Sequence, residues 1–233
     1  MNKVIRYSLL ILCLGFMASI VLVSEAKAQG PLGEILRRMD LNNQNLKTLR
    51  AGVTMDKFNP QLNTHDLTVG SSSYLSKTVK GTMYVRIDWT KPVQEQVSVI
   101  GDNYELYRPR LNQVIQGKTN QAKNSGSAGN ALAFMTMSKD QLKANYDVSY
   151  LGEEQISGGV KTWHLRLIPK GKTNYKSAEL WVDGDGMPRQ AKVIETNDDT
   201  TTVLLSDIQK NITINGSDFK LAYDKKKVKF IKA

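Results

Sequence analysis

Cysteine and histidine, which often carry catalysis or bind metals, are almost absent from the sequence. Its 233 residues include one cysteine, Cys13, and two histidines, His65 and His164. No His-x-His, His-Glu-x-x-His or Gly-x-Ser-x-Gly pattern occurs. Glu153 and Glu154 are neighbours on an expected strand and so point to opposite faces, which does not suit a paired acid and base. We therefore predict no enzyme activity, metal site or cofactor, and expect both histidines to face solvent.

The single cysteine lies in an N-terminal segment that has the pattern of a secretory signal peptide. Lys3 and Arg6 precede an apolar run, Tyr7–Val23, and Ala26-Lys27-Ala28 forms an Ala-x-Ala cleavage site. The apolar run continues past Cys13, which argues against lipidation there. An uncleaved membrane anchor is the alternative interpretation, because the run approaches the roughly 20 residues of a spanning helix. We predict cleavage after residue 28, a single exported domain over residues 29–233 with no cysteine, and no stable membrane insertion.

Acidic residues are outnumbered by basic ones. The whole chain has 32 basic and 22 acidic residues, and removing residues 1–28 leaves 29 (32−3) and 21 (22−1), a net charge of +8. An exported protein rarely meets nucleic acid, so anionic lipid headgroups or an acidic partner surface are favoured as targets. A basic surface that is simply solvated is the alternative. We expect an exported monomer.

The residues from Gly81 to Gly117 predict the central part of the fold. Apolar residues alternate with polar ones up to Trp89, and two further strands are expected at Gln96–Ile100 and Tyr104–Arg108. Proline and glycine clusters separate the three runs, which is typical of an antiparallel meander with one apolar wall. The residues predicted to form that wall are Met83, Val85, Ile87, Trp89, Val97 and Val99.

The rest of the chain is predicted to be mainly β with few helices. Apolar spacing of three and four predicts an amphipathic helix within residues 31–49, and Gly70–Ser73 is expected to be a mobile loop. Asp183–Gly186 resembles a calcium loop but lacks the later ligands, so a hairpin turn is expected. Short strands with regular turns favour an antiparallel sandwich or barrel. The expected strands are residues 48–58, 147–156, 160–167, 176–182, 187–196, 200–209 and 219–223.

A polar stretch, residues 118–129, is expected to be a flexible linker before a short apolar segment, residues 130–138. Ser138 and Gln141 have the spacing of a helix N-cap and its partner, which predicts a second helix from there to about residue 146. The segment is either a helix that covers the core or a movable lid over an apolar cavity. As a lid it would contribute Leu132, Phe134, Met135 and Met137, and the strand at residues 160–167 would add Trp163, Leu165 and Leu167 to the lipid-binding wall.

The ordered residues of the meander resemble the core of the LolA family of periplasmic lipoprotein carriers. They are Gly81, Tyr84, Val85, Arg86, Trp89, Pro92, Val99, Gly101, Asp102, Tyr107, Pro109 and Gln113, and further matches in order extend the resemblance to nearly the whole chain after residue 28. The resemblance implies an α+β fold, an unclosed antiparallel β half-barrel whose apolar concave face is covered by short helices. It also implies transfer of triacylated lipoproteins from an inner-membrane ABC release complex to an outer-membrane acceptor.

One position departs from the family pattern. The family commonly has an inward-facing arginine that holds the lid shut, and the ungapped position is Ile87, whereas Arg86 lies one residue earlier in the outward phase. A shift of one residue moves a side chain to the other face of a strand. Either a bulge turns Arg86 inward, as a candidate lid latch, or the lid closes by apolar contact alone.

Three functions are compatible with these patterns. The first is a carrier that binds lipoprotein acyl chains in an apolar cavity. The second is an envelope protein of the same fold that binds or senses another lipid for a regulatory partner. The third is an enzyme acting on envelope glycan or lipid, which would need a convergent polar cluster that the sequence does not show.

Overall fold

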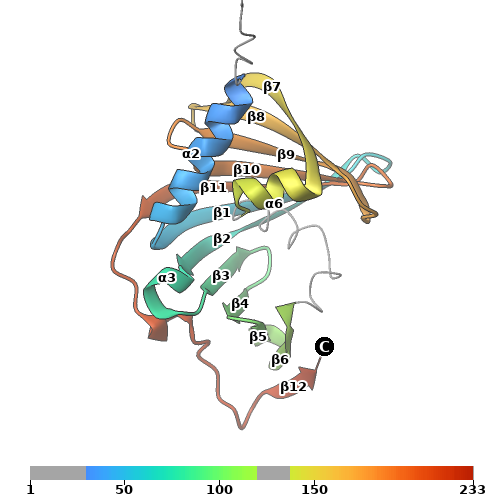
Figure 1. Cartoon of the computed structure of the whole chain (residues 1–233). Coiled ribbons are helices and arrows are strands. Elements are labelled where there is room, and N and C mark those ends of the chain that lie inside the picture. The colour runs from blue at the N-terminus through green and yellow to red at the C-terminus, as the bar shows by residue number, and fades with distance from the viewer. Residues whose placement is uncertain (1–29, 120–136, 233) are drawn as a thin grey trace, which may run out of the picture. The chain divides into compact units, whose positions relative to one another are not determined.

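A computed structural model describes residues 30–119 and 137–232. Twelve strands form one open sheet in the order β12-β6-β5-β4-β3-β2-β1-β11-β10-β9-β8-β7 (Figure 1). All neighbours are antiparallel except β12 and β6, which are parallel. The strands are β1 (Thr48–Asn59), β2 (Thr64–Leu75), β3 (Tyr84–Lys91), β4 (Glu95–Ile100), β5 (Asn103–Arg108), β6 (Gln113–Lys118), β7 (Tyr146–Ile156), β8 (Val160–Pro169), β9 (Tyr175–Asp183), β10 (Pro188–Glu195), β11 (Thr200–Lys210) and β12 (Lys229–Lys232).

Helices are few and short in the part of the chain that the structure describes. There the α-helices are α2 (Pro31–Asn45), α3 (Lys77–Lys80) and α6 (Lys139–Asn145), and two 3-10 turns are η2 (Pro109–Leu111) and η3 (Gly216–Phe219). Within the described ranges, none of these helices has the length and apolar character that crossing a bilayer requires.

Strand β1 joins the two halves of the sheet, because it pairs with β2 on one side and with β11 on the other. Its side chains alternate between buried and more exposed, as expected of a strand with one apolar face. Ala51 and Val53 are buried on the face that we call the inner face, and Met55 follows them in the same phase. The opposite face is called the outer face.

Helices α2 and α6 cover the inner face of β1 and β7–β11. Ile35, Leu36 and Met39 of α2 are fully buried and pack with Leu180 and other residues of these strands in one core cluster. Figure 1 shows both helices over this part of the sheet, whereas β3–β6 extend beyond them. In α6, Ser138 caps the helix, and its side chain accepts a hydrogen bond from the backbone of Gln141.

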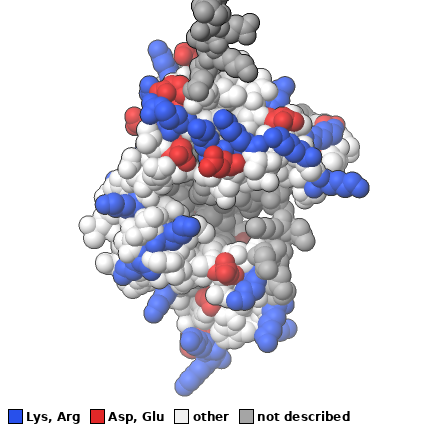
Figure 2. All heavy atoms as spheres, viewed as in Figure 1, with Lys and Arg blue, Asp and Glu red and all other residues white. Residues whose placement is uncertain are grey.

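The exposed side of α2 is polar. Glu34 accepts hydrogen bonds from Arg37 at 2.7 Å and from Arg38 at 2.8 Å, and these guanidinium groups lower the pKa of the Glu34 carboxyl to about 2. Figure 2 shows acidic and basic side chains close together over this part of the molecule. Part of the basic surface is therefore neutralised locally.

The outer face of β2–β4 is covered by the chain that follows β11. Phe219 is fully buried there, and its ring centroid lies 5.4 Å from that of Tyr84. Ser98 of β4 donates a hydrogen bond to the Phe219 carbonyl at 2.5 Å. Beyond this point the chain forms β12, which adds a parallel strand to β6.

The structure confirms the predicted fold class and corrects two local predictions. The sheet is open, with helices on one face, as the family resemblance implied, and it is neither a sandwich nor a closed barrel. Gly70–Ser73 lies in the middle of β2, so the expected mobile loop is wrong. Residues 219–223, expected as a strand, do not form one, because Phe219 is the last residue of η3 and residues 220–223 have no regular secondary structure. The predicted signal peptide and most of the predicted linker fall outside the described residues.

Gly186 holds the β9–β10 turn against α2 and provides a test of this packing. It has a positive φ of 83°, and a Cβ there would overlap the carbonyl of Arg38. We expect Gly186→Ala to destabilise the protein by roughly 2–4 kcal/mol in urea unfolding. Gly184→Ala is the matched control, because a Cβ there meets nothing within 4 Å. Equal stability of the two variants would contradict this packing.

Candidate functional site

Strand register arranges the inner face of β1–β6 in rows of apolar side chains. From β1 to β6, one row consists of Ala51, Ser72, Ile87, Val97, Leu106 and Ile115, and the next row consists of Leu49, Tyr74, Val85, Val99 and Tyr104. In the first row, the apolar side chains are more exposed at the β4–β6 end. Ala51 is 2% exposed and Ile87 is 6% exposed, whereas Val97, Leu106 and Ile115 are only half-buried. The apolar face therefore continues past the part that packs under the helices.

Small residues occupy the inner face of β2 between larger neighbours. Gly70 lies opposite Trp89, and Ser72 lies opposite Ile87. A Cβ on Gly70 would overlap the carbonyl of Asp88, so only glycine permits the close approach of β2 and β3 at this bulge. On the inner face, the side chains of Trp89 and Ile87 are therefore larger than those of the β2 residues opposite them.

Most of the residues predicted to form the apolar wall of the meander lie together on the inner face. Val85, Trp89 and Val97 are half-buried and pack against the core cluster that contains Ile87. Val99 lies beside Val85 in the register. Met83 is different, because it precedes β3 and is 36% exposed.

The predicted residues on β8 lie under the helices. Leu165 and Leu167 are fully buried in the core, so a ligand would reach them only if a helix moved. Trp163 is half-buried, with the guanidinium of Arg38 5.4 Å from its ring centroid. Of the predicted lid residues, Leu132, Phe134 and Met135 lie outside the described residues. The backbone carbonyl of Met137, the first described residue after that gap, accepts a hydrogen bond from the Asn43 side chain of α2 at 3.0 Å.

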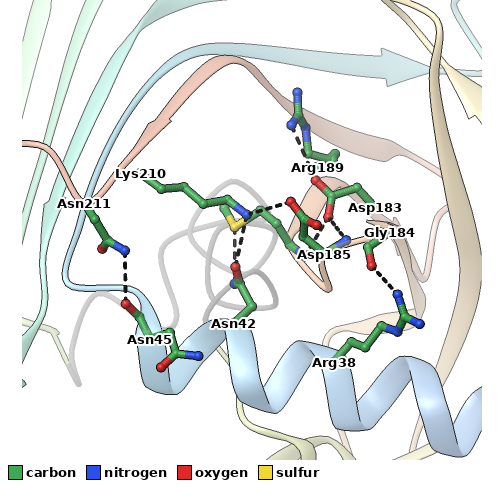
Figure 3. A network of polar contacts seen from close by, with 10 residues as sticks. Arg38, Asn42, Asn45, Asp183, Gly184, Asp185, Arg189, Lys210 and Asn211 are labelled. Carbon is green, nitrogen blue, oxygen red and sulfur yellow. Dashed lines mark hydrogen bonds and ion pairs between the residues drawn. The ribbon is translucent and has the colours of Figure 1, made fainter.

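A polar network fastens α2 to the β9–β10 turn (Figure 3). Arg38 donates a hydrogen bond to the carbonyl of Gly184 at 2.8 Å. Asp183 accepts hydrogen bonds from the backbone of Asp185 at 3.0 Å and of Met187 at 2.9 Å, which confirms the expected hairpin turn. These contacts make α2 a fixed part of the core.

The same network continues to the end of β11. Lys210 donates a hydrogen bond to Asn42 at 3.3 Å and lies 3.7 Å from Asp185 (Figure 3). The side chain of Asn211 donates to the carbonyl of Asn45 at 3.3 Å. A cavity of about 250 Å³ lies here, and it is lined by Leu41, Asn42, Asn45, Leu46, Asp185, Lys210 and Asn211. Because its charged groups already contact one another, we assign it to the attachment of α2.

Helix α6 is held at its C-terminal end. Leu142 is fully buried, and the hydroxyls of Tyr146 and Tyr175 are 2.7 Å apart. Burial, followed by this hydrogen bond, raises the pKa of the Tyr175 hydroxyl. The Tyr175 hydroxyl therefore stays protonated and hydrogen-bonded to Tyr146.

Arg86 faces the outer side of the sheet. The pairing of β3 with β4 runs without a bulge from Tyr84 to Trp89, so no local irregularity turns Arg86 inward. Its guanidinium donates to the carboxylate of Asp88 at 2.8 Å and to the carbonyls of Asp218 at 2.8 Å and Lys220 at 3.1 Å. The described contacts therefore connect Arg86 to the chain after β11 and give no support to its predicted role as a lid latch.

His164 belongs to an outer-face cluster that the sequence analysis missed. Its side chain is only 16% exposed, so the expectation that it faces solvent is wrong. The ring is stacked on Trp181 at 4.3 Å, and its nitrogens lie 3.0 Å from Glu154 and 3.3 Å from Glu179. Only the shared outward phase of His164, Trp181 and Glu179 could have indicated the cluster. His65, by contrast, is 56% exposed, as expected.

The fold and site together define a binding class of protein, an open sheet whose apolar inner face, in the described part of the chain, is only partly covered by helices. Residues 76–222 match the family model described as outer membrane lipoprotein carrier protein LolA. The chain therefore belongs to the LolA family. The matched range is shorter than the resemblance inferred from the sequence, and no curated protein matches the chain.

Solved structures support the same fold. An uncharacterized conserved protein from Thermus thermophilus aligns with a TM-score of 0.55 and 13% identity, covering 87% of this chain and 99% of that one. MucB aligns with a TM-score of 0.54 and 12% identity over 81% of this chain and 62% of its own. The complex of Pseudomonas aeruginosa MucA and MucB gives 0.51 and 12% identity, covering 81% and 60%. This chain thus spans less than two thirds of the MucB chain.

The contacts of Arg86 can be tested against a latch role. We expect Arg86→Ala to lower the free energy of unfolding by about 2–4 kcal/mol, because charged hydrogen bonds to the chain after β11 are lost. Chymotrypsin should then cleave at Phe219, which the wild-type protein buries, faster than before. Cleavage is followed by mass spectrometry, and Arg50→Ala, which alters an exposed arginine on β1, serves as the control. A change in acyl-chain affinity without faster cleavage at Phe219 would instead support the latch.

Proposed function

We propose that this protein is a periplasmic carrier that binds the acyl chains of lipoproteins on the inner face of β2–β6 and shuttles them from the inner to the outer membrane. The observation that carries the proposal is the half-buried apolar face of β3–β6, beyond α2 and α6, in a chain of the LolA family. The predicted signal peptide supports export to the periplasm. Under this proposal the chain binds and carries its ligand and performs no chemistry on it.

The proposed face suits an acyl chain because it offers apolar area with few polar groups. Val97, Leu106 and Ile115 lie side by side in one row, and the small Gly70 leaves the half-buried Trp89 beside it open to a ligand lying across β2. Each buried methylene contributes ~0.8 kcal/mol, so ten methylenes give on the order of 8 kcal/mol. Such binding depends on area and involves little directional bonding. Release then requires a change in the covering or transfer to a more apolar acceptor.

The partners follow from this role. The cargo would be triacylated lipoproteins, delivered by an inner-membrane ABC release complex and taken up by an outer-membrane acceptor. We expect the carrier to act as a monomer. The predicted lid residues Leu132, Phe134 and Met135, together with Met137, would cover the acyl chains.

A second candidate function is an envelope lipid-binding or lipid-sensing protein with a regulatory partner. The similarity to MucB, one of whose structures is a complex with MucA, favours this alternative. In this case the inner face would bind another lipid, and a protein partner would respond to whether the lipid is bound.

Native mass spectrometry of the protein purified from periplasm without detergent separates the two candidates. The chain is co-expressed with lipoproteins from its own source. A bound triacylated lipoprotein is the expected result for the carrier. Phospholipid or another lipid alone would favour the sensing protein, and a protein that remains empty even after incubation with membranes would contradict both.

A paired substitution on β4 tests the location of the site. Val97 faces the inner side, and its neighbour Gln96 faces the outer side. We expect Val97→Asp to weaken binding of a fluorescent fatty acid by roughly 10- to 100-fold, because a carboxylate is costly to bury against an acyl chain. Gln96→Asp introduces the same group on the same strand and should leave the affinity unchanged. If both variants bind like the wild-type protein, the ligand lies elsewhere.

A further inference from the structure

The chain end carries a concentration of lysines outside the range that matches the family. Residues 224–232 contain five lysines (225, 226, 227, 229 and 232) and one acidic residue, Asp224, giving a net charge of +4 (5−1). The family match ends at residue 222. We call residues 224–232 together with Leu111 the basic tip. Figure 2 shows lysine and arginine side chains at the lower end of the view, where Figure 1 places the chain leading into β12.

The basic tip has a defined structure. The backbone of Lys227 donates to the carbonyl of Asp224 at 2.9 Å, which closes a turn, and Lys229 donates to the carbonyl of Asn112 at 2.7 Å. From there β12 pairs in register with β6 through Ile231 and Ile115. The lysines are therefore held together on one ordered edge of the sheet.

Local acidic groups neutralise little of this charge. Asp224 is 3.7 Å from Lys227, whose side chain is still 79% exposed. Within the described part of the chain, Lys225, Lys226, Lys229 and Lys232 form no ion pair, and all four are exposed. An excess of unpaired, exposed positive charge favours an anionic surface as partner.

Exposed apolar side chains accompany the lysines. Leu111 is 58% exposed and immediately precedes Asn112, the residue that bonds Lys229. Phe230 is 45% exposed, and one side of its ring meets Tyr223 edge-on at 6.0 Å. Lysines with apolar and aromatic side chains among them are typical of segments that lie at a membrane interface.

We propose that the basic tip docks the protein on anionic phospholipid headgroups. Lysine is a mobile point charge without the planar fork with which arginine recognises single carboxylates, so a run of lysines suits a diffuse anionic surface better than a specific acidic peptide. Docking at β12 brings the neighbouring inner face of β6, with Ile115, close to the bilayer. The surface is separate from the acyl-binding face, and its function does not depend on the ligand proposed above.

Vesicle sedimentation with the full chain lacking residues 1–28 tests this surface. The probes are vesicles of phosphatidylglycerol and phosphatidylcholine, and vesicles of phosphatidylcholine alone. We expect binding to the first only, and weaker binding as salt is raised. Lys225→Gln, Lys226→Gln and Lys227→Gln combined should lower the partition coefficient by roughly 100-fold, about fivefold for each lysine.

The control removes the same charge elsewhere. Lys57, Lys161 and Lys172 are exposed on β1, β8 and the β8–β9 turn, and changing all three to Gln should leave most of the binding intact. Leu111→Ser should lower binding with no change in net charge. Circular dichroism and urea unfolding confirm that each variant is folded.

Three results would overturn the inference. They are equal loss of binding in the two lysine variants, full binding by the variant at residues 225–227, and binding to polyglutamate without binding to anionic vesicles. The last would identify an acidic protein as the partner. Vesicle binding together with failure to bind fatty acid would contradict the proposed carrier function but would still support the proposed docking surface.

Discussion

The structure depends on one constraint: its single twelve-stranded sheet has one apolar face, and that face has to be covered. Helices α2 and α6 cover the half formed by β1 and β7–β11, where Leu165, Leu167 and Leu180 are fully buried. In the described part of the chain neither helix covers the whole sheet, and the inner residues of β4–β6 are half-buried. An apolar face left partly open in this way loses the free energy that burial would supply, about 25 cal/mol for each Å². A ligand that covers it regains that free energy, which links the incomplete core to binding.

The outer face is closed by polar and aromatic contacts. His164 and Trp181 are stacked between Glu154 and Glu179 on the β7–β9 side. On the β2–β4 side, the chain after β11 inserts Phe219 and is held there by Ser98 and by Arg86. These contacts are directional and lie within the protein. The two faces therefore differ in physical character, since the outer one is occupied by the chain itself and the inner one offers undirected apolar area.

Local patterns predicted most elements but not their tertiary partners. Period-two alternation located β3, β4 and β8, and the Ser138 cap located α6, because these signals arise within a few residues of chain. Gly70–Ser73 was misread as a loop, because small residues usually mark turns, whereas here they accommodate the close approach of β3. The phase of Arg86 was read correctly as outward, but two of its partners, the carbonyls of Asp218 and Lys220, are more than 130 residues away and no local pattern indicates them. Likewise, alternation placed Leu165 and Trp89 in one apolar wall, and only the packing of α2 separates the buried residue from the accessible one.

Binding and delivery place opposite demands on a surface, and this chain can meet both by separating them. A face that holds acyl chains has to exclude charge, because a charged group near an apolar ligand loses its hydration. A surface that finds an anionic membrane needs charge in contact with water, where its attraction extends over about one Debye length, ~8–10 Å. The inner row ending at Ile115 has the first property and the lysines preceding β12 have the second. Since β12 pairs directly with β6, the two surfaces meet at one edge of the sheet. Electrostatic approach would then orient the apolar face toward the bilayer, and neither surface would compromise the other.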